Sequence, residues 1–185
     1  MKYSYFQNKK QPPVGEVTDQ EVVNLIRHDE KLAHMTLDIR QHITANDIAT
    51  ADFIKGELSS VTFSARFTGG RRYDKLTEYN GEIVIDLDKK TPEELVRISE
   101  AVTGNPFTHI SFTSPKGNGY KLTVQTSLPD GTLPQSPEEV RNYHAHAYDQ
   151  VAALYEELCQ TDIDESGKDM TRICYLPHDE NVYLN

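Results

Sequence analysis

Two short sequences, Thr91-Pro-Glu-Glu94 and Ser136-Pro-Glu-Glu139, mark the beginnings of two helices in this chain. Each places a hydroxyl residue at the N-cap, proline at the first helical position and glutamate at N3, which together form a capping box. Runs rich in β-branched and aromatic residues, which are typical of strands, surround them at 82–88, 107–113, 120–126 and 172–176. The order of elements from residue 82 onward is therefore predicted to be β-α-β-β-α-β.

This order is that of the split βαβ unit of ferredoxin-like and RNA-recognition-motif-like folds. We therefore predict an α+β protein whose RNA-recognition-motif-like core covers residues 55–185, with its first and third strands in the middle of an antiparallel sheet. An alternating apolar pattern predicts a further strand over 60–67. Residues 1–54 predict an N-terminal extension, an extended arm followed by helices, that packs on this core. The 185 residues suggest one structural domain overall.

Composition limits the classes of function that fit this chain. The net charge of −10 is unfavourable for nonspecific binding of duplex DNA, so nucleic-acid contact would need a local basic patch, a bridging metal or a partner. Two cysteines are too few for a disulfide scaffold or a zinc site and fit core thiols in a reducing cytoplasm. No apolar run reaches the roughly 20 residues of a membrane span, so we expect a cytoplasmic protein without membrane contact.

The strand predicted at 82–88 ends with two aspartates, Asp86 and Asp88. Side chains at i and i+2 of a strand point to the same face, so these carboxylates are expected side by side, with Leu87 turned into a core. Two close carboxylates repel each other unless a cation compensates them, and Mg²⁺ or Mn²⁺ takes oxygen ligands of this kind. Two interpretations stay open, a divalent-metal site or two solvated acids at a strand end.

The hairpin loop between the next two predicted strands is rich in hydrogen-bond donors. Gly117 and Gly119 let backbone amides approach a phosphate closely, and Lys116 and Lys121 add positive charge. The alternative is a hairpin in which the pair Asn118-Gly119 only makes the turn. The loop is therefore a candidate phosphate cradle or a simple connection.

A polar segment before the last predicted strand supplies further candidates. Asp169 is a candidate third metal carboxylate, with Asp164 as the alternative, and Arg172 is a candidate partner for phosphate. A surface pair between Asp169 and Arg172 explains the same residues equally well. Arg71 and Arg72 follow a glycine turn and are candidate contacts to phosphate or template.

Three segments in this order, 81–89, 112–121 and 163–172, resemble the N-terminal domain of virulence-associated protein E-like proteins, a primase-like domain of bacterial mobile elements. The resemblance runs from about residue 55 to residue 185, and residues 1–54 carry little of it. These domains are similar to the archaeo-eukaryotic primase (prim-pol) superfamily, whose catalytic core is RNA-recognition-motif-like. The resemblance thus implies the same core fold as the order of elements.

The resemblance also implies a function, that of a primase/polymerase-like nucleotidyltransferase that uses two divalent metals, Mg²⁺ or Mn²⁺, in mobile-element DNA replication. It implies that the catalytic and metal-binding acids are Asp86, Asp88 and Asp169, with Asp164 as the alternative third acid. It implies that the nucleotide and its phosphates contact Ser114, Lys116, Gly117, Gly119, Lys121 and Arg172. The implied template contacts are Arg71, Arg72 and Tyr120.

The partners that this function implies are nucleoside triphosphates, single-stranded DNA, and a helicase-like region in the same or a partner chain. Lys121 departs from the pattern, because the superfamily has a histidine at the matching position. This departure favours an alternative function for the same fold. In that alternative, the domain is a catalytically inactive module that binds single-stranded nucleic acid or interacts with the helicase.

Overall fold

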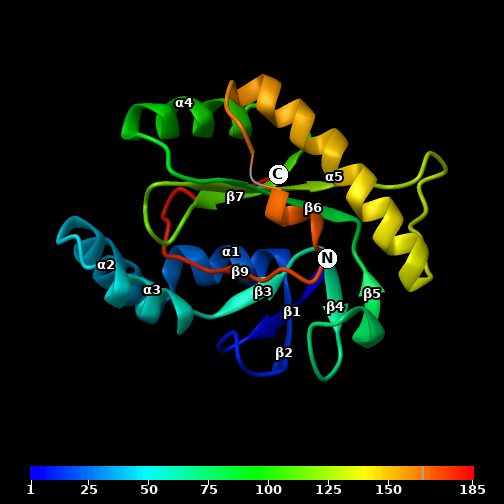
Figure 1. Cartoon of the computed structure of the whole chain (residues 1–185), viewed down its shortest axis with the longest axis horizontal. Helices are drawn as coiled ribbons and strands as arrows, with labels where there is room; N and C mark the ends of the chain where they lie inside the picture. Colours follow the sequence, from blue (N-terminus) through cyan, green and yellow to red (C-terminus); the bar gives the residue numbers. More distant parts are fainter. Residues whose placement is uncertain (164) are drawn as a thin grey trace.

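The computed structural model describes residues 1–163 and 165–185, and these residues form a mixed α+β protein with five α-helices and three antiparallel sheets (Figure 1). The helices are α1 (Asp19–His28), α2 (Glu30–Thr44), α3 (Ile48–Gly56), α4 (Pro92–Thr103) and α5 (Pro137–Cys159). The strands are β1 (Lys2–Phe6), β2 (Gly15–Thr18), β3 (Ser60–Thr62), β4 (Ala65–Phe67), β5 (Leu76–Tyr79), β6 (Glu82–Leu87), β7 (Thr108–Thr113), β8 (Tyr120–Gln125), β9 (Cys174–Tyr175) and β10 (Tyr183–Leu184). Two 3₁₀ helices complete the described chain, η1 (Tyr73–Lys75) and η2 (Glu165–Lys168).

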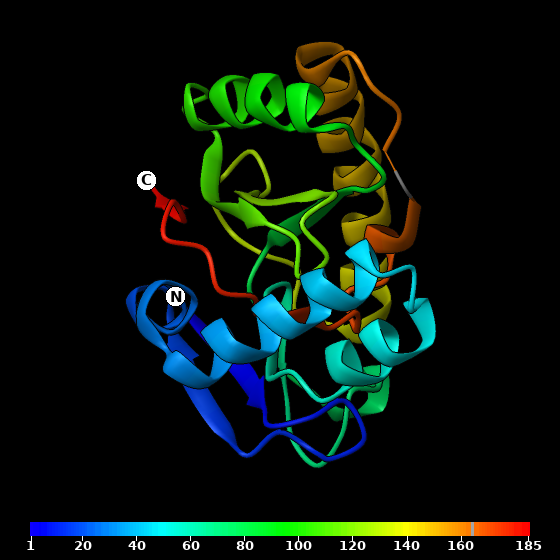
Figure 2. The same cartoon turned by 90° about the vertical axis from the view of Figure 1, so that its left-hand side faces the viewer.

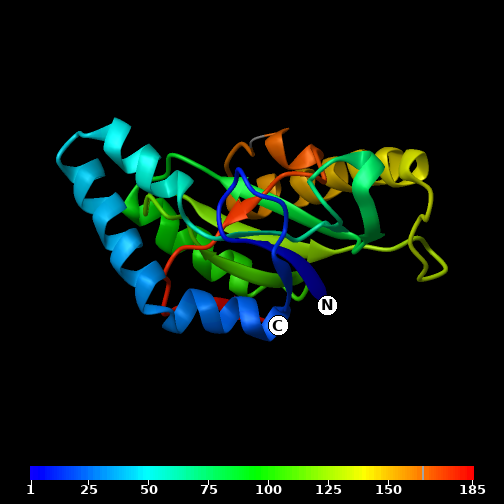
Figure 3. The ribbon, with the colours of Figure 1, turned by 90° about the horizontal axis from the view of Figure 1, so that it is seen from below.

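Two four-stranded sheets, ordered β10-β7-β8-β6 and β2-β1-β3-β9, form the inner layers of the molecule. Helices α4 and α5 cover one face of the first sheet, and the second sheet with α1–α3 lies on the other side (Figure 1, and turned by 90° in Figure 2). The space between the two sheets is filled by a hydrophobic core to which both sheets contribute. It includes Phe63, which follows β3, and Phe112 of β7. Helices α2 and α3 lie at the opposite end of the molecule from the loop that precedes α5 (Figure 3).

Both capping boxes predicted from the sequence are present. The side chains of Thr91 and Ser136 each accept a hydrogen bond from the backbone N–H of N3, and the carboxylates of the N3 glutamates each accept one from the N-cap backbone N–H. Proline occupies the first turn of both helices. Backbone N–H groups in the first turn make no intrahelical hydrogen bond, so the absence of an N–H on proline costs nothing there. The starts of α4 and α5 are therefore local properties of the sequence, as predicted.

The side chains of β6 alternate between its two faces, as the strand geometry predicts. Ile83, Ile85 and Leu87 are fully buried against α4 and α5. Val84 and Asp86 point the other way, towards the layer formed by the second sheet. The aspartates at the end of β6 therefore face the space between the two sheets.

The order β6-α4-β7-β8-α5 follows the prediction, but the last strand does not. In a split βαβ sheet, β9 would pair with the first core strand, β6. Instead β9 pairs with β3, with Val61 opposite Cys174, and β6 is an edge of its sheet. Helix η2 packs on that edge so closely that a Cβ on Gly167 would lie 2.3 Å from the carbonyl oxygen of Val84. This contact takes the place that the fourth strand would need, so the RNA-recognition-motif-like sheet order is not formed.

The strand predicted over 60–67 is two strands in two different sheets, β3 and β4. The chain turns between them because Asn80 ties both sides of the bend, donating to the carbonyl oxygen of Phe63 and, from its backbone, to that of Ser64. The predicted N-terminal arm is a β-hairpin of β1 and β2. The other edge of β1 pairs with β3. Among the described residues, no helix combines the length and the apolar character needed to cross a membrane.

Candidate functional site

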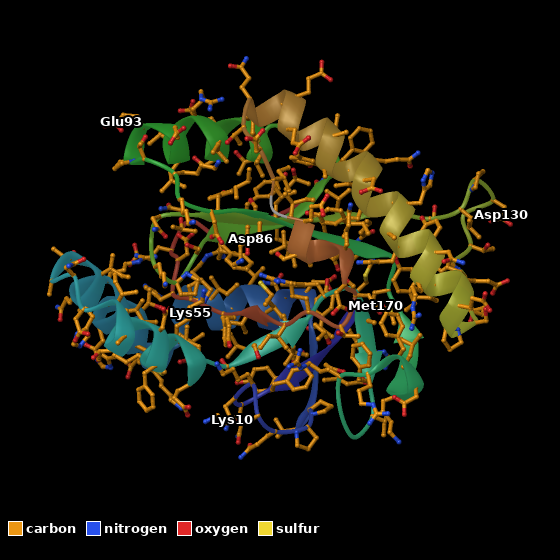
Figure 4. All side chains as sticks on the ribbon, in the orientation of Figure 1. Lys10, Lys55, Asp86, Glu93, Asp130 and Met170 are labelled. Atoms are coloured by element: carbon orange, nitrogen blue, oxygen red, sulfur yellow. The ribbon has the colours of Figure 1, made fainter. Side chains whose placement is uncertain are left out.

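A cleft of about 360 Å³ opens between the two layers, at the end of β6. It collects side chains from segments that are far apart in the sequence: α3, the turn before η1, the ends of β6 and β8, and the segment from η2 to β9. Four cationic side chains and three carboxylates line it, namely Lys55, Arg71, Lys121, Arg172, Asp86, Asp88 and Asp169. Figure 4 shows the labelled Asp86 near the centre of the molecule, with the labelled Lys55 on the facing layer.

The innermost pair in this cleft is Asp86 and Lys121. They are direct cross-strand neighbours on β6 and β8, both are buried, and the ammonium of Lys121 donates to Oδ2 of Asp86 in a short ion pair. Burial is the largest influence on the pKa of Lys121 and lowers it, but the charge and hydrogen bond of Asp86 together with the other nearby negative groups leave this pKa above its ordinary value. Oδ1 of Asp86 is buried and has no hydrogen-bond partner among the described residues.

Asp88 lies two residues further along, exposed at the rim of the same cleft. Its carboxylate packs against the backbone of Gly119, where a Cβ would lie 2.9 Å from Oδ1 of Asp88 and 2.9 Å from the carbonyl oxygen of Leu87. Only glycine fits this approach, because a real Cβ essentially never comes so near another heavy atom. The two aspartates thus share a face, as the alternation predicted, but differ in exposure and partners.

Asp169 lines the cleft through a tight turn before β9. Its carboxylate accepts hydrogen bonds from the backbone N–H and the hydroxyl of Thr171, at 2.9 and 2.8 Å, and its carbonyl accepts one from the N–H of Arg172. The bond from the N–H of Thr171 to the Asp169 side chain is that of an Asx turn, and Arg172, which follows this turn, lines the cleft. Among the described residues, no carboxylate lies within ion-pair distance of Arg172. The surface pair between Asp169 and Arg172 is therefore not formed.

Arg71 and Lys55 supply the other two positive charges. Arg71 donates to the carbonyl oxygen of Thr171 at 2.9 Å and lies over the ring of Phe6, which fixes its guanidinium against the turn. Lys55 lies over the ring of Tyr175, with Nζ 5.7 Å from its centroid. Burial, followed by the nearby charge of Lys121, lowers the pKa of Lys55. Sequence reasoning missed Lys55, since nothing in the local sequence of α3 distinguishes this lysine.

The predicted phosphate loop between β7 and β8 does not line the cleft. Lys116 instead forms an ion pair with Asp52 of α3 at 2.7 Å. Arg40 of α2 donates to the carbonyl oxygen of Ser114 and packs against Gly117. The two helices thus hold the loop from outside, and among the loop and β8 residues proposed for phosphate only Lys121 reaches the cleft.

Two further predicted contacts also lie elsewhere. Arg72 is exposed and pairs with Asp74, whereas its neighbour Arg71 lines the cleft. Tyr120 is buried on the opposite face of its sheet, where its hydroxyl lies 3.2 Å from that of Ser111. Asp164, the alternative third acid, lies outside the described residues.

The sequence predicts a divalent metal at the carboxylates Asp86, Asp88 and Asp169. Within residues 1–163 and 165–185, no group of three His, Cys, Asp or Glu side chains is placed to hold a metal ion. Asp86 already has an ammonium at one oxygen, and both oxygens of Asp169 accept from Thr171. The described residues therefore do not fit a preformed two-metal centre.

Comparison with known proteins gives one family. Residues 54–184 match the family described as BT4734-like, N-terminal domain, so the chain belongs to that family. No curated protein matches the chain, and no solved structure matches it.

This family match corrects the resemblance drawn from the three sequence segments. The family found is BT4734-like, N-terminal domain, and not the virulence-associated protein E-like or prim-pol domain that the segments suggested. The roles of the cleft residues can therefore not be inferred from the primase superfamily.

Proposed function

We propose that this domain binds a nucleoside triphosphate, whose phosphates lie in the cleft against Arg172, Arg71 and Lys121. The observation that carries the proposal is the gathering of four cationic side chains from four separate segments around one cleft of about 360 Å³. That volume lies within the range of about 300–1,000 Å³ that small-molecule sites occupy. Guanidinium groups suit this role because they bind phosphate oxygens through two parallel hydrogen bonds.

The overall charge favours a compact phosphate ligand over a long polyanion. The net charge of −10 repels an extended nucleic-acid backbone, whereas a triphosphate needs only a local positive site. Arg172 is the side chain best suited to the first contact, because it is exposed and has no carboxylate partner among the described residues.

Titration of the protein with a fluorescent ATP or dATP analogue tests the proposal. Arg172→Ala is expected to weaken binding by about tenfold to a hundredfold, since a charge-assisted hydrogen bond is worth about 1.5–3 kcal/mol and 1.4 kcal/mol is a factor of ten. Arg72→Ala is the matched control, because Arg72 lies outside the cleft and pairs with Asp74. Equal affinities for both variants, or no binding by the unmodified protein at millimolar nucleotide, would contradict the proposal.

Nucleotidyl transfer is the second candidate function. One observation favours it: Oδ1 of Asp86 is buried without a hydrogen-bond partner among the described residues, and Asp88 lies two residues away on the same cleft. Primer synthesis on a single-stranded template with labelled nucleotides and Mn²⁺ or Mg²⁺ tests it. Primer synthesis by the unmodified protein that is lost in the double variant Asp86→Ala, Asp88→Ala would support transfer. Nucleotide binding without any product would contradict transfer and support nucleotide binding only.

A further inference from the structure

The buried ion pair at the base of the cleft has a direct bearing on how phosphate is held. Lys121 and Asp86 oppose each other on adjacent strands, so the backbone of the sheet holds the two charges together. The ammonium takes the position next to Oδ2 of Asp86, where a divalent cation would otherwise bind. A second cation at this carboxylate would have to displace the lysine or lie beside it, against the repulsion of like charges.

The surroundings of the lysine hold one matching carboxylate. Asp86 accepts the side-chain hydrogen bond of the Lys121 ammonium, and both side chains are buried. Cys174 of β9 lies beside the same two side chains. The pair itself therefore combines one ammonium with one carboxylate.

The ammonium still has hydrogen-bonding capacity on the side of the cleft. A lysine ammonium has three N–H donors, and the side-chain bond found for Lys121 uses one of them, to Asp86. Lys121 lines the cleft together with Arg71 and Arg172. A phosphate group placed there meets one ammonium and two guanidinium groups, while Asp86 balances the charge of the lysine.

We propose that Lys121 is the resident cation of this cleft, held by Asp86, and that it binds the nucleotide's phosphate directly, so that phosphate binding needs no divalent metal. This inference rests on the nucleotide binding proposed above. It assigns Asp86 the role of positioning the lysine. It also separates the two candidate functions. Metal-dependent transfer at Asp86 requires a divalent cation on this carboxylate, whereas the role proposed for Lys121 requires none.

The experiment is a titration with the fluorescent ATP analogue in excess EDTA and again in 5–10 mM Mg²⁺, on the scale of about millimolar metal that saturates weak sites. The unmodified protein is expected to bind within about threefold of the same affinity in both buffers. Asp86→Asn keeps the lysine side chain, and the bound phosphate then supplies the compensating negative charge, so this variant is expected to bind in EDTA, somewhat more weakly because the lysine is less well positioned. Lys121→Met is expected to lose at least tenfold in both buffers.

Removal of Lys121 alone leaves a buried carboxylate without its partner, which is strongly destabilising. The double variant Asp86→Asn, Lys121→Met removes both charges, and circular dichroism of each variant shows whether it is folded. If this folded double variant binds as weakly as expected for Lys121→Met, the lysine is responsible for the loss. If it binds as well as the unmodified protein, the inference is overturned.

The remaining outcomes separate this inference from the proposed function. Binding that EDTA abolishes, that Mg²⁺ or Mn²⁺ restores and that Asp86→Asn loses would place a metal at Asp86 and overturn the inference, while nucleotide binding itself stands. Binding in neither buffer would overturn the proposed function and the inference together. Equal affinities in EDTA and Mg²⁺, with loss only when Lys121 is replaced, would support both.

Discussion

The hydroxyl of Tyr3 donates a hydrogen bond of 2.7 Å to Oε2 of Glu82, although 79 residues separate them in the chain. Both residues are fully buried. The other carboxylate oxygen of Glu82 lies 2.8 Å from Nδ1 of His109. The N-terminal hairpin is thus joined to the first strand of the other sheet by a buried polar contact.

Replacing Tyr3 by phenylalanine is expected to destabilise the protein by about 1.5–3 kcal/mol, because a buried carboxylate oxygen loses its hydrogen-bond partner. Urea unfolding followed by circular dichroism measures the change. Tyr5→Phe on the same strand is a control, since no hydrogen bond of its hydroxyl is found in the described residues. An unchanged unfolding midpoint for Tyr3→Phe would show that this contact does not stabilise the folded state.

His144 is expected to make stability depend on pH. Its Nδ1 lies 3.0 Å from the hydroxyl of Tyr79 and its Nε2 lies 3.0 Å from the carbonyl oxygen of Gly167. Burial lowers its pKa, so the folded state favours the neutral ring. A lowered histidine pKa gives stability that is present above the unfolded value of about 6.5 and is lost as pH falls below it.

Replacing His144 by glutamine is therefore expected to cost about 1–3 kcal/mol near pH 8, from the two hydrogen bonds, and less as pH falls from about 6.5 to 5. Denaturant unfolding at several pH values measures both. His146→Gln, exposed on the same helix, is the control, and near pH 8 it is expected to change stability by less than about 0.5 kcal/mol. A pH-independent difference for His144→Gln would contradict the role assigned to its neutral form.

Gly167 is expected to tolerate no side chain. A Cβ there would lie 2.3 Å from the carbonyl oxygen of Val84 and 2.5 Å from the ring of Tyr148. Gly167→Ala should push η2 off the edge of β6 and cost about 1–3 kcal/mol. Because η2 also borders the cleft through Ser166, nucleotide affinity should fall as well.

Gly15→Ala is the matched control, since a Cβ at Gly15 meets nothing within 4 Å, and its effect should stay within about 0.5 kcal/mol. Thermal unfolding and nucleotide titration of both variants test the pair. Equal stabilities would mean that η2 can shift without loss, and that the close approach at Val84 is not needed.

Lys116 is expected to contribute little to either stability or binding. Its ion pair with Asp52 lies at the surface, where such pairs are worth about 0–1 kcal/mol, and it does not line the cleft. Lys116→Ala should therefore leave nucleotide affinity unchanged, in contrast to Arg172→Ala. If Lys116→Ala loses as much nucleotide affinity as Arg172→Ala, the hairpin loop between β7 and β8 contacts the phosphates after all and this prediction is wrong.

Local sequence was enough where the determinants are local. The capping boxes at Thr91 and Ser136 define helix starts within four residues, and both form as predicted. The period of two along β6 correctly put Leu87 in the core and turned Asp86 towards the other face. These features depend on dihedral angles and on neighbours along the chain, so the sequence alone predicts them.

The sheet order and the composition of the cleft depend on contacts between distant segments. Strand β9 could pair with the edge of β6 or with the edge of β3. Because Gly167 of η2 packs closely on Val84 of β6, the strand pairs with β3. Lys116 is directed away from the cleft because Asp52 of α3 attracts it, and Lys55 enters because α3 ends beside β9. No local pattern encodes these relations.

The sequence by itself thus determined the capped starts of α4 and α5, the order β6-α4-β7-β8-α5 and the face on which Asp86 lies. The tertiary structure decided which strand joins which sheet, which cations meet at the cleft, and that the partner of Asp86 is Lys121. The physical reason is that pairing of strand edges and desolvation of charges depend on what other segments place nearby. Such neighbours become defined only when the whole chain is folded.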